Sequence, residues 1–108
     1  MLFVTYWELN ENMPVNERLN IAAKLTSAGL FPPEGVKILQ WITTPDGWGI
    51  TLAEADSAAA ISRSMEIWRM AGAGFFKTSK TAPAMQIDKE LIDGFVEAGA
   101  QVQKLFHS

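Results

Sequence analysis

The chain has 108 residues, of which 48% are hydrophobic, and it carries a formal net charge of -3. This length allows one domain with a hydrophobic core but not a second independent domain, so we expect a single domain over residues 1–108. The absence of cysteine excludes disulfides, thiolate metal sites and cysteine nucleophiles. The acidic pI near 5.0 and the scattered basic residues argue against a nucleic-acid-binding surface.

The hydrophobic residues occur in short runs. No run approaches the roughly 20 apolar residues of a membrane span, so we expect no insertion into a membrane. The first run, Leu2 to Trp7, has no basic residue before it and is followed by acids, which favours a strand over a signal peptide. A cytoplasmic location is therefore expected.

The first half of the chain predicts a strand, a helix and a connector. Leu2 to Trp7 is rich in β-branched and aromatic residues, which favours a strand. A helix is expected from Pro14, which suits a first helical turn, to Gly29, which supplies a stop. Residues 30–35 contain two prolines, which cannot continue a helix, so they lead into the next strand.

The segment from Val36 to Glu54 predicts a β-hairpin. Two apolar runs flank the turn Thr44-Pro45-Asp46-Gly47. Pro45 presets φ at the first central position, and Gly47 can adopt the positive φ that a turn exit often needs. This is the clearest structural signal in the sequence.

The residues after the hairpin predict a second helix, which Asp56 or Ser57 can cap. Its apolar residues recur on one face, and glycines at 72 and 74 end it. The positions on that face are Ala58, Ile61, Met65 and Trp68.

The last third of the chain predicts a strand and a helix. Phe75 to Thr81 favours a fourth strand, and Pro83 favours an edge position or a strand end. Asp88 can cap a helix that runs to Phe106 with one apolar stripe. We therefore expect a core over residues 1–81, followed by a linker and a C-terminal helix over residues 82–108.

This order of elements predicts an α+β fold of the ferredoxin-like type. The pattern is βαββαβ with a four-stranded antiparallel sheet plus an added C-terminal helix. Right-handed crossovers place the two main helices on one face of the sheet, which leaves the other face open.

Strand alternation divides the sheet residues into two sets that point to opposite faces. The mainly aliphatic set suits the helix-covered face; it comprises Leu2, Val4, Tyr6, Val36, Ile38, Ile42, Trp48, Ile50 and Leu52. The opposite set is expected on the open face and is too apolar to remain in water, so we expect a homodimer through that face. The expected interface residues are Phe3, Thr5, Trp7, Leu39, Trp41 and Thr51.

Several segments together resemble a family of small bacterial proteins grouped as DUF3303, a domain of unknown function. They are MLFVTYWE, PPEGVKILQW, the DGWG turn, the LAEADS junction and MEIWRM, and the resemblance covers roughly Met1 to Thr81. It implies a dimeric α/β-barrel, in which two ferredoxin-like sheets pack face to face, but no activity. The tail after the last strand departs from the pattern. The residues that match the pattern are Trp7, Pro33, Glu34, Gly35, Trp41, Asp46, Gly47, Glu54 and Trp68.

Aromatic side chains provide the candidate ligand site. Tyr6, Trp7 and Trp41, with Glu54, are expected around a pocket for a small apolar ligand, because indole rings form rigid apolar walls with one donor each. The alternative is that these rings fill the core and the dimer interface.

Candidates for acid–base or metal chemistry are few. Strands one and three are expected to run parallel, which places Glu8 and Glu54 at the same sheet edge, and a shared site can raise the pKa of one carboxyl. The favoured alternative is that both acids are solvated, because both precede loops. The single histidine, His107, lies near the C-terminus, where chains fray. We therefore expect no metal and no cofactor.

Two functions remain open at this stage. The leading hypothesis is a homodimer that is non-catalytic or binds a small apolar ligand. The competing hypothesis is a cofactor-independent monooxygenase- or isomerase-like enzyme that acts on a small aromatic or polyketide-like substrate. The C-terminal helix can dock on its own domain, exchange between subunits or bind a partner.

Overall fold

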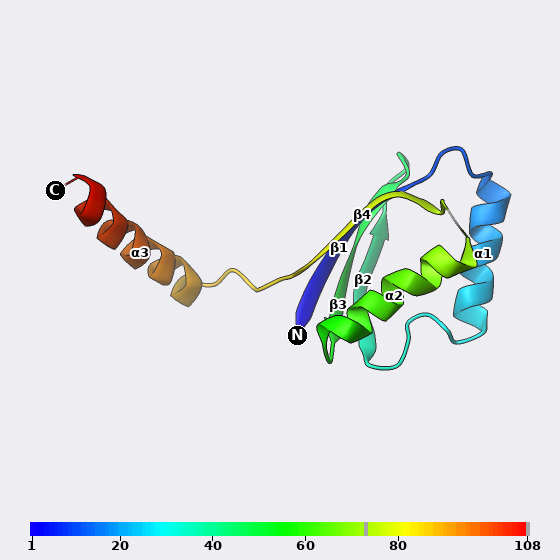
Figure 1. Ribbon diagram of the computed structural model, residues 1–108, viewed down its shortest axis with the longest axis horizontal. Coiled ribbons are helices and arrows are strands. Elements are labelled where there is room, and N and C mark those ends of the chain that lie inside the picture. The colour runs from blue at the N-terminus through cyan, green and yellow to red at the C-terminus, as the bar shows by residue number, and fades with distance from the viewer. Residues whose placement is uncertain (73, 108) are drawn as a thin grey trace.

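The computed structural model describes residues 1–72 and 74–107; Ala73 and Ser108 lie outside the described residues. The elements follow the predicted order and form a ferredoxin-like α+β fold with an extra C-terminal helix (Figure 1). They are β1 (Leu2–Leu9), α1 (Val15–Ser27), β2 (Val36–Thr43), β3 (Trp48–Ala55), α2 (Ala58–Ala71), β4 (Phe76–Pro83) and α3 (Lys89–His107).

The four strands form one sheet in the order β2-β3-β1-β4. All three neighbouring pairs are antiparallel, as the split βαβ pattern predicts. Helices α1 and α2 lie on one face of this sheet (Figure 1), and the other face carries no helix. The core therefore forms between the sheet and these two helices.

The hairpin turn has the geometry that its sequence predicts. Gly47 has a φ of 78°, and its amide donates to the carbonyl of Thr44 at 3.2 Å. The Thr44 hydroxyl donates to the carbonyl of Trp48 at 2.9 Å, which closes the turn on its far side. The turn fixes the register of β2 on β3.

The helix caps also follow the sequence. The Ser57 hydroxyl accepts a hydrogen bond from the Ala60 amide at 3.2 Å at the start of α2. Asp88 Oδ1 accepts from the Leu91 amide at 2.8 Å at the start of α3. Each cap satisfies an amide that has no partner within its helix.

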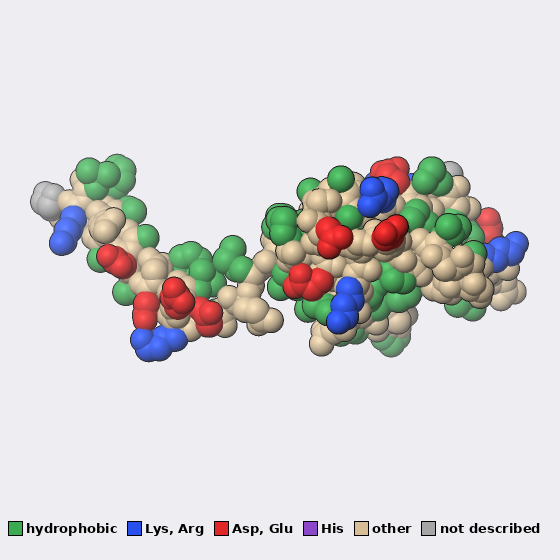
Figure 2. Space-filling model, turned by 90° about the horizontal axis from the view of Figure 1, so that it is seen from below, with side chains coloured by type: hydrophobic (Ala, Val, Ile, Leu, Met, Phe, Trp, Pro, Cys, Tyr) green, Lys and Arg blue, Asp and Glu red, His purple; other side chains and the backbone are tan. Residues whose placement is uncertain are grey.

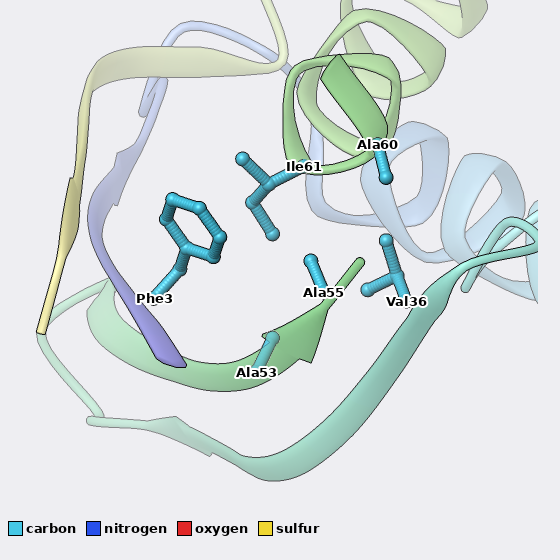
Figure 3. Packing of buried hydrophobic residues seen from close by; sticks show 6 residues of the cluster. All are labelled: Phe3, Val36, Ala53, Ala55, Ala60 and Ile61. Atoms are coloured by element: carbon cyan, nitrogen blue, oxygen red, sulfur yellow. The ribbon is translucent and has the colours of Figure 1, made fainter. Parts of the chain in front are cut away.

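The faces of β1, β3 and the second half of β2 are opposite to the prediction, whereas Val36 and Ile38 lie on the helix-covered side as expected. Phe3 and Ala53 point toward Ile61 of α2 and pack with it in a buried cluster (Figure 3). Five residues that were expected on the open face lie on the helix-covered side, so that part of the prediction is wrong. They are Phe3, Thr5, Trp7, Trp41 and Thr51.

The reason for the reversal is side-chain volume. On the helix-covered side Phe3 pairs with Ala53, and Trp7 pairs with Gly49. A Cβ on Gly49 would lie 2.5 Å from the Trp7 ring, closer than two carbons can approach. Large aromatic rings of β1 therefore fit under the helices because β3 offers small residues opposite them.

An irregularity in β2 changes its alternation. The register shifts between Ile38 and Gln40, and Leu39, 42% exposed, lies at this bulge. A bulge adds one residue to one strand, so the residues on either side no longer alternate simply. Ile38 and Trp41 consequently both lie on the helix-covered side, although they belong to opposite sets in the sequence.

The centre of the open face is apolar, although Lys80 and Gln40 lie opposite Tyr6 and Leu52 on the same face. Val4, Tyr6, Ile50 and Leu52 are half-buried at its centre. Exposed apolar side chains continue it toward β2 and the turn, and they include Ile42 at 47% and Trp48 at 41% exposure. We call these six apolar residues the open-face patch.

Helix α3 extends away from the rest of the molecule at the end of an extended linker (Figure 1). None of its described residues is buried. Its hydrophobic side chains lie mainly along one side and its charged side chains along the other (Figure 2). The apolar side includes Ile92, Phe95, Val102 and Leu105, all exposed.

The close packing of Trp7 on Gly49 gives a first prediction. Gly49→Ala should lower the free energy of unfolding by about 1–3 kcal/mol, because the added methyl group overlaps the Trp7 ring and the Ile42 carbonyl. Chemical denaturation followed by tryptophan fluorescence measures this. Gly94→Ala is the control, since no atom lies within 4 Å of a Cβ there, and it should leave the unfolding of the core unchanged. Equal stability of both variants would contradict the packing argument.

Candidate ligand cavity

A cavity of about 460 Å³ lies between the sheet and helices α1 and α2. This volume and its mainly apolar lining are typical of small-molecule sites. The lining comes from β1, β2, β3, β4, α1 and α2 and from the loop before β4. It consists of Thr5, Trp7, Leu9, Val15, Arg18, Leu19, Ala22, Trp41, Thr43, Thr51, Ile61, Ser64, Met65, Trp68, Phe75 and Phe76.

Aromatic rings around Trp68 form one wall of the cavity. Trp68 is 3% exposed, and the centres of the Phe75 and Phe31 rings lie 4.9 and 5.1 Å from its own. Trp41 from β2 contacts the same ring edge-on at 5.9 Å. Rings in such tilted and edge-to-face contacts stabilise one another, which makes this wall rigid.

The floor of the cavity is the central part of the sheet, where polar groups are already paired. The Trp7 indole Nε1 donates to Thr51 Oγ1 at 3.1 Å. The hydroxyls of Thr5 and Thr81 are hydrogen-bonded at 2.8 Å. These pairs satisfy the groups within the protein, so the floor mainly offers apolar surface to a ligand.

Helix α1 contributes exposed side chains to the lining of the cavity. Val15 and Leu19 face the cavity but remain 58% and 63% exposed. Arg18 lies between them and also lines the cavity. Its Nε is buried and has no hydrogen-bond partner among the described residues.

The structure brings together some of the predicted ligand-site residues but not all of them. Trp7 and Trp41 line the cavity. Tyr6 lies on the open face, where its ring is 6.0 Å from that of Trp48. Glu54 lies at the end of β3, and its carboxylate accepts from the Met1 amine at 3.2 Å outside the cavity.

The prediction that Glu8 and Glu54 meet is wrong. Strands β1 and β3 are antiparallel, so Glu8 pairs with Trp48 whereas Glu54 pairs with Leu2. The two carboxylates therefore lie near opposite ends of the sheet, about 20 Å apart along the strands.

The sequence did not predict Arg18, which lines the cavity, or Phe31, which packs against Trp68 without lining the cavity. A signal for Arg18 was present, because it interrupts the apolar stripe of Val15, Leu19 and Ala22 at helical spacing. An arginine within a stripe that faces the sheet is a candidate for binding. Phe31 had no comparable signal, because it lies in the connector before β2.

Comparison with known proteins identifies the family of the chain. Residues 1–100 match the family described as Domain of unknown function (DUF3303). The chain belongs to this family. The match extends beyond Thr81 into α3, so the DUF3303 pattern includes part of the segment that was expected to depart from it. A comparison with curated proteins found no significant match.

The described residues form neither a membrane-spanning helix nor a cluster of metal ligands. No helix among residues 1–72 and 74–107 has the length and hydrophobicity to cross a bilayer. In the same part of the chain, no three His, Cys, Asp or Glu side chains group as metal ligands.

The tyrosine on the open face gives a pH prediction for this DUF3303 protein. The hydrogen bond that Tyr6 donates to Glu8, together with burial and the negative charge of Glu8, raises the pKa of Tyr6. The neutral phenol is thus favoured by the fold; this contribution to stability is present at neutral pH and is lost as pH rises through the folded-state pKa.

This shift can be measured directly, because Tyr6 is the single tyrosine of the chain. The ultraviolet absorbance of tyrosinate should titrate above the usual value of about 10. Glu8→Gln should lower the midpoint toward that value, whereas Glu66→Gln on α2 should not change it. A normal midpoint in the native protein would contradict the hydrogen bond.

Proposed function

We propose that this DUF3303 protein is a homodimer that binds a small apolar molecule in the cavity between its sheet and helices. The observation that carries the binding proposal is the cavity of about 460 Å³ with its wall of aromatic rings. Most of its lining is apolar, and few polar groups converge on it, as in known ligand pockets.

The exposure of the apolar side chains of α1 favours a ligand cavity over a core that the chain fills with its own side chains. In a core that the chain fills by itself, the stripe of α1 would be packed against the sheet, as Trp68 of α2 is. Instead Val15 and Leu19 face the cavity while more than half exposed. An apolar ligand would cover these side chains and remove their surface from water.

The competing proposal is a cofactor-independent enzyme for a small aromatic or polyketide-like substrate. Such an enzyme needs a group that moves a proton within reach of the substrate. Glu54, the carboxylate that was expected to do this, is engaged by the Met1 amine at the sheet edge. Hydroxyls and Arg18 are the polar groups that face the cavity, and this lining favours binding.

A cavity-filling variant tests the binding proposal. The probe is naphthaleneacetamide, a neutral bicyclic amide, and its binding is measured by isothermal titration calorimetry. Ala22→Phe places a ring in the cavity and should weaken binding at least about tenfold, which corresponds to about 1.4 kcal/mol.

Ala23→Phe is the matched control. Ala23 is the next residue of α1 and is exposed, so the same substitution there should leave the affinity unchanged. Absence of binding to the native protein, or equal binding by both variants, would refute the cavity as the site.

The dimer proposal rests on the open-face patch. Half-buried Val4, Tyr6, Ile50 and Leu52 form an apolar surface at the sheet centre, and such surfaces usually mark interaction sites. A second copy is the occupant we propose, because a two-fold axis lets the same patch cover itself. The interface therefore uses this patch and not the residues expected from the sequence.

The exposed apolar side and the length of helix α3 also favour the homodimer. Its apolar side is exposed in the isolated chain, and its 19 residues span about 28 Å, close to the length of an eight-residue strand. We propose that α3 of each copy packs beside the sheet of its partner. This exchange of α3 between the two copies would bury the apolar side of α3 and the open-face patch, which the single chain leaves uncovered.

Charge introduced into the open-face patch tests the dimer. Ile42→Lys should shift the mass measured by light scattering from dimer to monomer, because a buried ammonium without a partner is strongly unfavourable. Leu30→Lys is the control, since Leu30 is similarly exposed but lies in the connector after α1. A monomeric native protein at all concentrations would contradict the dimer.

A further inference from the structure

We infer that the ligand of this cavity carries a carboxylate, or a planar anion of the same kind, and that Arg18 binds it. This inference rests on the proposed function, because it specifies the ligand of that same cavity. The aromatic part of the ligand contacts Trp68 and Trp7, and its acid group lies at the α1 side beside Arg18.

The first observation is the position of Arg18. Its neighbours on the cavity side of α1 are Val15, Leu19 and Ala22, so a cation stands within an otherwise apolar stripe. The lining contains no other charged side chain. A single cation in an apolar cavity selects a ligand that is itself apolar with one acidic end.

The second observation is that the described residues offer the Arg18 guanidinium no hydrogen-bond or ion-pair partner. Its Nε is buried without a hydrogen bond. The ion pairs found in the described part of the chain join Met1 to Glu54, Arg69 to Glu66 and Lys89 to Asp93, and none includes Arg18. Buried polar groups are normally paired, so this nitrogen is a donor that a ligand acceptor could satisfy.

Ordinary packing of an arginine accounts for part of this arrangement. A long basic side chain often lays its aliphatic stem on apolar surface and keeps its charged head in water. Arg18 is half-buried in this way, but its Nε is removed from water without a hydrogen-bond acceptor. Such a position is unfavourable in the empty protein and becomes favourable when a ligand acceptor occupies it.

The chemistry of the guanidinium identifies the acceptor. Nε–H and the adjacent Nη–H point in parallel along one edge of the group, and a carboxylate accepts both in a bidentate pair. A neutral carbonyl satisfies only one of these donors well. The half-exposed Arg18 side chain turns its edge toward the acid group of the ligand at the α1 side of the cavity.

A matched pair of probes tests the inference by calorimetry. Naphthaleneacetate and naphthaleneacetamide have the same ring system and differ in the charge of one group. The native protein should bind the acid about tenfold more tightly than the amide. Arg18→Gln should abolish this preference while leaving the affinity for the amide unchanged.

Arg63→Gln is the control variant. It removes the same charge from an exposed position on α2, so the preference for the acid should remain about tenfold. Arg18→Gln should also not lower the melting temperature of the free protein, because it removes an unpaired buried nitrogen. If Arg18→Gln does not fold, Arg18→Lys keeps the charge but loses the bidentate edge, and the preference should still fall.

The outcomes separate this inference from the proposed function. If the amide binds and the acid binds no more tightly, or if the preference survives in the Arg18 variants, the role of Arg18 is refuted and the cavity remains a ligand site. If neither probe binds, the proposed function fails and this inference fails with it.

Discussion

The packing of the Trp7 indole over Gly49 is the contact on which the rest of the structure depends. The ring needs a residue without a side chain opposite it, because a Cβ on Gly49 would overlap it. This requirement decides which face of β1 and β3 lies under the helices. Once Trp7 lies on the helix-covered side, its Nε1 reaches the Thr51 hydroxyl, and the floor of the cavity is formed. The aliphatic side chains of the same strands, including Ile50, are then left on the open face.

The order and limits of the elements follow from local signals in the sequence. Gly47 in the turn and Ser57 at the start of α2 act through neighbouring backbone groups, so a short segment is enough to recognise them. Which face of each strand lies under the helices does not follow from such local signals. Alternation divides the strand residues into two sets but does not say which set lies inward, and hydrophobicity favoured the wrong one. The deciding factor was the fit of Phe3 and Trp7 against small partners on β3, which is a tertiary property.

The candidate site was predictable only in part, for the same reason. Trp7 and Trp41 were expected as cavity walls, and both line the cavity. Trp41 reaches it because the bulge in β2 resets the alternation, and nothing in the sequence marks that bulge. Tyr6 was expected beside Trp7, but adjacent strand residues point to opposite faces. Glu54 was expected there because the relative direction of β1 and β3 was assigned incorrectly.

The cavity and the proposed dimer interface share the two central strands. Alternate residues of β1 face the two sites, since Trp7 lies in the cavity floor and Tyr6 in the open-face patch. A dimer interface on the open face would hold β1 and β3 in place. It would therefore keep the cavity floor, on the other face of the same strands, rigid. Helix α1 has fewer constraints, because Leu25 is its one buried residue and Val15 and Leu19 are exposed. The proposed site thus combines an aromatic floor fixed by the sheet with a less buried helix that carries Arg18, so a ligand would cover the exposed apolar side chains of α1.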